Sequence, residues 1–245
     1  MRKRFQNPPI AEAVFEVFVP RCPTWDEKTN ELLASSFSKE LNGRRENLQI
    51  HGLSIDFGPT GAKSIENSTP RTRLWNQECA RMIQFGPEMC ALNALPPYTQ
   101  FEDYIPQFEA LVRAYLSATG SQSLSWIGQR YINKVVLPNA EEDPQNIFSI
   151  YPNLPTEVRE KHPPFAIQVE VMRLPEATIT VNLQFQGMQA EGKPSYILDI
   201  YAKSILSMNA NSSEIISWNN KIHDQLYRAF LFCIPEIHAK RLFKE

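Results

Sequence analysis

The chain lacks most of the features that reveal a protein's chemistry from sequence. It has no run of about 20 apolar residues, the length that a helix needs to cross a bilayer, and no apolar run follows its basic N-terminal residues. We therefore expect no membrane span, no signal peptide and a cytoplasmic location. The recognisable nucleotide-binding, esterase, zinc-protease and calcium-binding motifs are also missing, which argues against an enzyme.

Cysteine, glycine and net charge are low as well. The four cysteines form no CxxC pair and have no metal-ligand spacing, so we expect reduced thiols and no metal or other cofactor. Nine glycines stand against nineteen prolines, which indicates stiff, extended connections. The formal net charge of −2 lacks the strongly basic balance that is typical of nucleic-acid binding.

The spacing of the apolar residues predicts an α+β fold. Residues that alternate between apolar and polar predict strands at 12–19, 50–58, 72–77, 80–85, 88–94, 125–137, 165–171, 178–186 and 195–203. Helical periodicity predicts helices at about 24–42, 100–118 and 212–232, followed by a short helix after Pro235. Thr24 and Glu27 have the spacing of a capping box. Pro106 requires that its helix starts near Asp103 or bends.

Both parts of the chain follow the same plan, which is a strand, several antiparallel strands and a closing helix. We therefore expect two similar halves, residues 1–120 and 121–245, each an antiparallel sheet covered on one face by long helices. The halves are expected to pack as one unit. Within the second half, the proline-rich segment 138–164 follows the strand predicted at 125–137, and its composition predicts an ordered but irregular loop.

Polar residues inside otherwise apolar strands are the best candidates for a ligand site. They are Gln84, Arg130, Asn133 and Asp199. An arginine offers a carboxylate two parallel hydrogen bonds, so an Arg130–Asp199 pair across strands is attractive. Such a pair would fix the strand register; alternatively, Arg130 would line a cleft that holds an anionic ligand.

Several short segments resemble a sporadically distributed family of uncharacterised bacterial proteins of about this length. They are the opening NPPIAEAVFEV (7–17), the central IGQRYIN (127–133), the later LDI (198–200) and Pro97-Tyr98. The resemblance implies a bacterial origin and a patchy, mobile-gene distribution, as for a component of a phage-defence or toxin–antitoxin-like cassette. It implies no activity and therefore supplies no catalytic residues.

The leading hypothesis is a non-enzymatic recognition or assembly subunit that binds a protein partner. Aromatic residues are favoured at the centres of interfaces, and homo-oligomerisation is left open. The candidate anchors are Trp25, Trp75, Tyr98 and Tyr151.

Two other functions are kept as alternatives. The first is a small-molecule or nucleotide-binding protein, or an enzyme, with its cleft around Arg130. The second is nucleic-acid binding, which the acidic balance places third. Its candidate residues are Arg44, Arg45, Arg71, Arg73 and Arg81.

Overall fold

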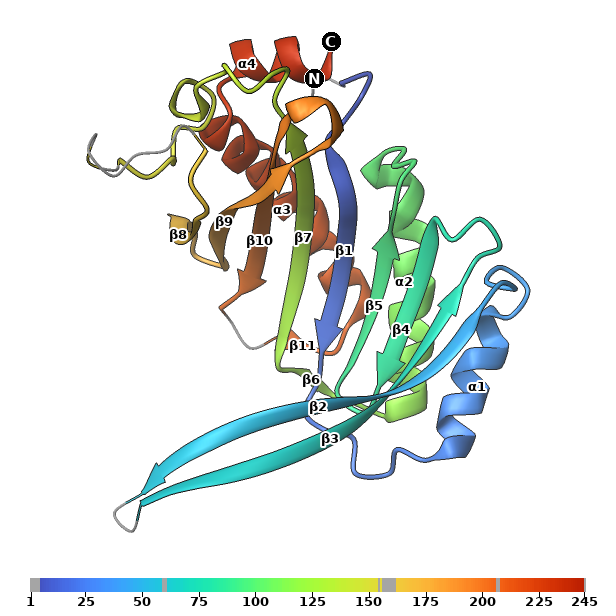
Figure 1. Ribbon diagram of the computed structural model, residues 1–245. Helices are drawn as coiled ribbons and strands as arrows, with labels where there is room; N and C mark the ends of the chain where they lie inside the picture. The colour runs from blue at the N-terminus through green and yellow to red at the C-terminus, as the bar shows by residue number, and fades with distance from the viewer. Residues whose placement is uncertain (1–4, 59–60, 154, 156–161, 206–207, 245) are drawn as a thin grey trace.

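The computed structural model has the predicted α+β fold, and the residues that it describes form four α-helices and one antiparallel sheet of nine strands (Figure 1). It describes residues 5–58, 61–153, 155, 162–205 and 208–244, and for 52–58 and 61–67 it describes the backbone alone. The order of the strands across the sheet is β2-β3-β4-β5-β1-β7-β10-β9-β8. A short β6–β11 pair forms a separate two-stranded sheet.

The strands of the large sheet are β1 (Ile10–Phe18), β2 (Arg45–Gly58), β3 (Gly61–Trp75), β4 (Arg81–Gly86), β5 (Met89–Ala94), β7 (Trp126–Val136), β8 (Ala166–Arg173), β9 (Ala177–Met188) and β10 (Pro194–Ser204). The small pair consists of β6 (Ser123–Leu124) and β11 (Met208–Asn209). The helices are α1 (Glu27–Phe37), α2 (Phe101–Thr119), α3 (Ser212–Cys233) and α4 (Glu236–Phe243).

The strand β1 occupies the middle of the sheet. It pairs antiparallel with β5 on one side and with β7 on the other, so the strands of both parts of the chain belong to one continuous sheet. Ala13, Phe15 and Val17 of β1 are fully buried and belong to the main hydrophobic core. Successive residues of a strand point to opposite faces, so Glu12, Val14 and Glu16 lie on the other side.

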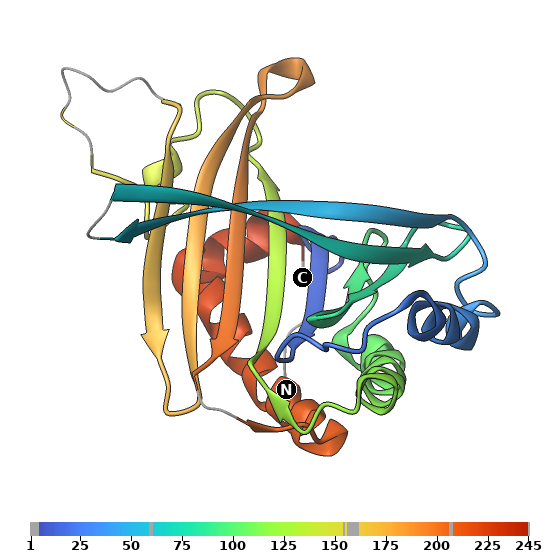
Figure 2. The ribbon, with the colours of Figure 1, turned by 90° about the horizontal axis from the view of Figure 1, so that it is seen from below.

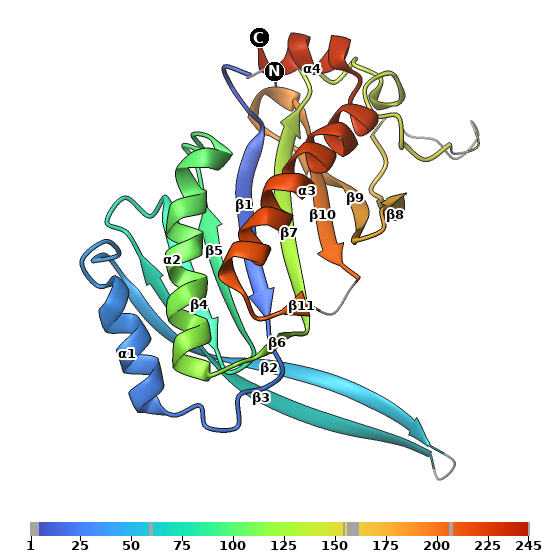
Figure 3. The same ribbon diagram turned by 180° about the vertical axis from the view of Figure 1, so that it is seen from behind.

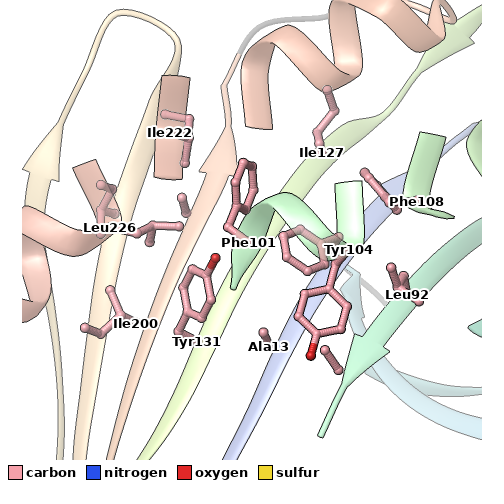
Figure 4. Close-up of a cluster of buried hydrophobic side chains, with 14 of the residues drawn as sticks. Ala13, Leu92, Phe101, Tyr104, Phe108, Ile127, Tyr131, Ile200, Ile222 and Leu226 are labelled. Atoms are coloured by element: carbon pink, nitrogen blue, oxygen red, sulfur yellow. The ribbon is translucent and has the colours of Figure 1, made fainter. Parts of the chain in front are cut away.

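Helices α2 and α3 pack against each other and against the centre of the sheet. The helix α2 contacts β5, while α3 contacts β7, β9 and β10 (Figure 3). Figure 4 shows how their side chains meet those of the strands: Tyr131 of β7 lies between Leu226 of α3 on one side and Phe101 of α2 on the other. The core between these elements is apolar, which makes its burial the main source of stability.

The ends of two helices differ from the sequence prediction. The helix α1 is capped by Asp26, whose Oδ1 accepts a hydrogen bond of 2.8 Å from the backbone nitrogen of Thr29. The capping box predicted at Thr24 is therefore wrong. The helix α2 starts at Phe101 and runs through Pro106. It ends, as its sequence suggests, at Gly120, which adopts the left-handed conformation with φ of 66°.

The strands β2 and β3 are much longer than the sequence pattern indicates. They pair with each other from Arg45 and Leu74 out to Gly58 and Gly61, but β3 pairs with β4 only through residues 72–75. Residues 49–58 and 61–70 therefore project from the sheet as a two-stranded ribbon, here called the β2–β3 ribbon. Figure 2 shows this ribbon in front of β7–β10 and α3 behind them.

The described part of the proline-rich segment is ordered and mostly irregular, as predicted. It contains a short 3-10 turn, Pro144–Asn146, after which Ile147 and Phe148 are buried in the core. His162, near the C-terminal end of this segment, is held by hydrogen bonds of both ring nitrogens. Its Nδ1 lies 2.8 Å from the Tyr196 hydroxyl, and its Nε2 lies 2.9 Å from the Ala140 carbonyl oxygen. Of the helices in the described residues, none has the length and apolar composition needed to span a membrane.

Candidate functional site

The face of the sheet that points away from α3, here called the strand face, carries most of the polar strand residues. The strand registers place them in rows that cross the sheet. One row contains Val14, Arg130, Tyr201 and Thr180, which lie directly opposite one another on β1, β7, β10 and β9. Because side chains on one face alternate along each strand, the neighbouring rows bring Glu16 and Asp199 to the same surface.

Arg130 and Asp199 form an ion pair with two hydrogen bonds. Arg130 Nε donates to Asp199 Oδ1 over 2.7 Å, and Nη2 donates to Oδ2 over 2.6 Å. The Asp199 side chain is 11% exposed and that of Arg130 is 42% exposed, so the carboxylate lies inside and the guanidinium at the surface. The hydrogen bond to Asp199 raises the pKa of Arg130 above its ordinary value.

Glu16 and Tyr201 meet on the strand face over Gly128 of β7. A Cβ atom at position 128 would lie 2.6 Å from Glu16 Oε1 and 2.9 Å from Tyr201 Cε2, so this contact needs a glycine. Burial raises the pKa of Glu16 above its ordinary value, although the Tyr201 hydroxyl and the charge of Arg130 act in the opposite direction.

A second polar group links β1 to β5 and β4. The amide nitrogen of Asn93 donates to Glu12 Oε1 over 2.6 Å, and Gln84 Nε2 donates to Asn93 Oδ1 over 3.1 Å. Asn93 is only 4% exposed, so its hydrogen bonds compensate for the loss of water. This group, the Glu16–Tyr201 pair and the Arg130–Asp199 pair together fix the polar side chains of the strand face.

An aromatic pair lies at one end of the strand face. Phe18 and Trp126 are directly opposite on β1 and β7, and their rings stack with centroids 3.7 Å apart. The Lys203 amine lies 4.7 Å from the centre of the Trp126 ring, in the position of a cation–π contact. Both rings are half-buried and thus reach the surface. Trp126, Tyr201 and Glu16 are not among the site residues predicted from the sequence.

A polar hollow of about 220 Å³ lies beside the Arg130–Asp199 pair. Its other lining residues are Gln168, Thr180, Asn182 and Tyr201. Drug-sized ligands usually occupy pockets of about 300–1,000 Å³. The hollow is therefore more suitable for one polar side chain or a carboxylate than for a nucleotide.

The four predicted ligand-site residues do not lie together. Arg130, Asp199 and Gln84 are on the strand face, with Gln84 in the Asn93 group. Asn133 is three residues after Arg130, so it points to the opposite side of β7, where it is 3% exposed. Its amide nitrogen donates to the carbonyl oxygens of Tyr131 and Leu198, at 3.2 and 3.0 Å.

The four predicted anchors for a partner are half-buried and pack against other rings of the protein. Trp25 contacts the rings of Phe85 and Tyr115, and Tyr98 stacks on Tyr104 with centroids 5.1 Å apart.

The other two anchors also have internal partners. Trp75 is covered by the Arg44 guanidinium, 5.0 Å from the centre of its ring, and its indole nitrogen donates to Glu46. Tyr151 lies edge-on to Phe165, with ring centroids 4.9 Å apart. Much of the surface of these four aromatics is thus used within the fold.

Three of the five arginines proposed for nucleic-acid binding have acidic partners. Arg45 forms two hydrogen bonds with Glu31, and Arg44 lies 3.0 Å from a carboxylate oxygen of Glu46. Arg73 approaches the same Glu46 carboxylate at 3.9 Å. These pairs offset much of the positive charge that would attract a phosphate backbone.

In the part of the chain that the structure describes, no three His, Cys, Asp or Glu residues are grouped as metal ligands. Cys22, Cys90 and Cys233 are buried, while Cys79 is exposed. No protein-family model, curated protein or solved structure matches the chain.

Proposed function

We propose that the protein is a non-enzymatic recognition or assembly subunit that binds a protein partner between its strand face and the β2–β3 ribbon. From the resemblance of its short segments to the bacterial family, we propose that this subunit belongs to a bacterial defence or toxin–antitoxin-like cassette. The observation that carries the proposal is the ribbon itself.

The β2–β3 ribbon has no further strand beside it over residues 49–58 and 61–70 within the described chain. A two-stranded hairpin is marginally stable in water unless something packs against it. A partner seated between the ribbon and the strand face would supply that packing. Ile50, at the base of the ribbon, is 41% exposed and offers the partner an apolar contact.

The strand face carries the residue types that dominate binding energies at interfaces. These are tryptophan, tyrosine and arginine, present here as Trp126, Tyr201 and Arg130. The three side chains are neighbours on this face. The Trp126 ring lies edge-on to the Tyr201 ring with centroids 6.4 Å apart, and the Arg130 guanidinium carbon lies 6.0 Å from the centre of the Tyr201 ring. Because each is already held by neighbours, binding would freeze few additional side-chain rotations.

The polar hollow favours a protein partner over the alternative of a small-molecule cleft at Arg130. It is small, open to the strand face and lined with both donors and acceptors. An acidic or amide side chain of a partner would fill it and contact the exposed side of Arg130. This recognition needs no chemical step and fits a subunit that assembles rather than catalyses.

We also propose that the sheet consists of two similar halves, residues 1–120 and 121–245. In the first, β1 pairs with β5, the strand that precedes α2; in the second, β7 pairs with β10, the last strand of the large sheet before α3. The two opening strands, β1 and β7, pair with each other at the centre. An approximate two-fold axis between β1 and β7 accounts for all three pairings.

The test is purification of the tagged protein at native level from its own host, followed by mass spectrometry. We expect one stoichiometric protein partner. Two variants locate its site: Trp126→Ala, and a ribbon deletion in which an Asn-Gly turn joins Leu48 directly to Arg71. These two residues face each other in the β2–β3 register, so a two-residue turn closes the shortened hairpin.

The matched control is Phe232→Ala on α3, because Phe232 is 53% exposed on the other side of the molecule. Both site variants should lose the partner while the control keeps it. A wild-type protein that purifies alone, or a partner retained by both folded site variants, would rule out the proposal. If the partner is a second copy of this chain, the purified protein has the mass of a dimer. The strand face would then be a site of self-assembly.

A further inference from the structure

A cavity of about 780 Å³ lies on the helix side of the sheet, away from the strand face. Its walls come from the N-terminal segment at Phe5 and Pro8–Ile10, the first turn of α2, the strands β7 and β10, and α3. The volume is in the range of about 300–1,000 Å³ found for small-molecule sites.

Aromatic rings form much of the cavity wall. They belong to Phe5, Tyr98, Phe101, Tyr131, Tyr227 and Phe230. Figure 4 shows Phe101 and Tyr131 facing the aliphatic side chains of Ile200 and Leu226, which also line the cavity. Flat rings and branched aliphatic groups on facing walls suit a planar apolar molecule, which can stack on the former and pack against the latter.

Hydrogen bonds connect Gln129, Tyr131 and His223 at the cavity wall. Gln129, which is fully buried, donates from Nε2 to the Tyr131 hydroxyl oxygen over 3.1 Å. The Tyr131 hydroxyl in turn lies 2.9 Å from His223 Nδ1, and the His223 ring stacks on Phe101 with centroids 4.1 Å apart. The Tyr131 hydroxyl and His223 Nδ1 share this hydrogen bond, and the tautomer of His223 sets which of the two donates. The wall is thus held in one arrangement before a ligand arrives.

Asn133 supplies the group that a ligand can use. Its amide nitrogen is bound to the backbone carbonyl oxygens of Tyr131 and Leu198, which fixes the orientation of the side-chain amide. The side chain lines the cavity, and within the described residues its Oδ1 accepts no hydrogen bond. An asparagine that is 3% exposed thus keeps one oriented acceptor for an N–H or O–H donor.

The charged residues of the cavity wall indicate whether the ligand is an anion or an uncharged molecule. Among the described lining residues Glu102 is the one acidic side chain, and there is no lysine or arginine. The described wall therefore offers a phosphate or carboxylate no cationic partner of the kind that buried anions need.

We infer that this cavity is a binding site for an uncharged planar aromatic molecule that carries an N–H or O–H donor. The rings stack on the ligand, and Asn133 Oδ1 accepts the hydrogen bond from its donor. The site lies on the opposite side of β7 from Arg130 and Trp126, so it is independent of the proposed partner surface.

The probe is 1-aminoanthracene, a neutral planar amine whose fluorescence rises in an apolar site. We expect saturable binding with one site per chain, measured by fluorescence and by calorimetry. The anion 9-anthracenecarboxylate has a similar ring system and should bind at least tenfold more weakly, because the wall offers it no cation. Leu226→Trp should reduce the affinity for the amine at least tenfold by filling the cavity.

Asn133→Leu should reduce the affinity for the amine by about tenfold, the effect expected for the loss of one hydrogen bond. Circular dichroism and the melting temperature check the fold of each variant, and Leu226→Phe replaces Leu226→Trp if the larger ring prevents folding. Trp126→Ala, on the strand face, should bind the probe as the wild type does. Failure of the wild type to bind, tighter binding of the anion, or unchanged binding in the folded cavity-filling variant would each overturn the inference.

Discussion

Glu16 of β1 and Tyr201 of β10 lie close to each other although β7 lies between their strands. The contact is made over Gly128, whose missing side chain leaves the space for both groups. It connects an early strand of the chain to a late one, across the central strands of the sheet. Glu16 is thereby held in the middle of the proposed partner surface.

Replacing Gly128 with alanine should destabilise the protein. The new Cβ would lie 2.6 Å from Glu16 Oε1 and 2.9 Å from Tyr201 Cε2, so one of the two side chains must move. We expect a loss of about 1–3 kcal/mol in the free energy of unfolding, measured by urea denaturation. Adding Glu16→Ala to this variant should restore part of the loss, and an unchanged stability of Gly128→Ala would contradict the contact.

The Glu16→Gln variant should show a stability difference that depends on pH. The folded pKa of Glu16 is raised above its ordinary value of 4.5, so the folded state resists ionisation of this group. The wild type therefore loses stability relative to the glutamine variant as pH rises from below 4.5 through the folded pKa of Glu16.

Urea denaturation of both proteins across this pH range checks the sign. The free energy of unfolding of Glu16→Gln minus that of the wild type should be smallest at low pH and should level off near neutral pH. A difference that falls as pH rises would mean that the folded protein favours the charged carboxylate. Gln184→Ala, an exposed change on β9, should show no such dependence.

The Arg130–Asp199 pair should contribute measurably to stability. Arg130→Ala leaves the carboxylate of Asp199, which is 11% exposed, without its partner. Because Arg130 itself is 42% exposed, we expect about 1–2 kcal/mol rather than the larger loss known for fully buried pairs. A double-mutant cycle with Asp199→Ala measures the pairwise part, which should be about 1 kcal/mol. If the losses in the free energy of unfolding of the two single variants add up to that of the double variant, the two residues do not interact.

Two substitutions at the start of α1 distinguish the observed cap from the predicted one. Asp26→Ala removes the acceptor for the Thr29 backbone nitrogen and should cost about 1 kcal/mol. Thr24→Ala lies outside the helix and should change the free energy of unfolding by less than about 0.5 kcal/mol. Thermal unfolding of both variants tests this order, and the reverse order would restore the capping box at Thr24.

The sequence predicted the α+β class and most strands of the sheet because their apolar residues alternate clearly. It did not predict the length of β2 and β3, because the strand pattern breaks at Gly52 and residues 61–70 are mostly polar. Asp26 was missed as a cap because Thr24 and Glu27 have the same spacing as a standard capping box.

For the candidate site, Arg130 and Asp199 were identifiable because charged residues stand out in apolar strands. Their pairing follows from the β7–β10 register, which the sequence does not contain. Asn133 was grouped with Arg130, although an odd spacing along a strand already implies opposite faces. The signal for the Glu16–Tyr201 contact was Gly128, since an isolated glycine within a strand often marks a close approach.

The central position of β1 has a consequence for how the chain folds. Residues 10–18 leave the ribosome before any other strand, yet their partners β5 and β7 come more than 70 and 100 residues later. During synthesis both edges of this apolar strand are open to other chains, which is a state that favours aggregation. Long loops must close before either pairing forms, so we expect slow folding in which completion of β7 is the decisive step.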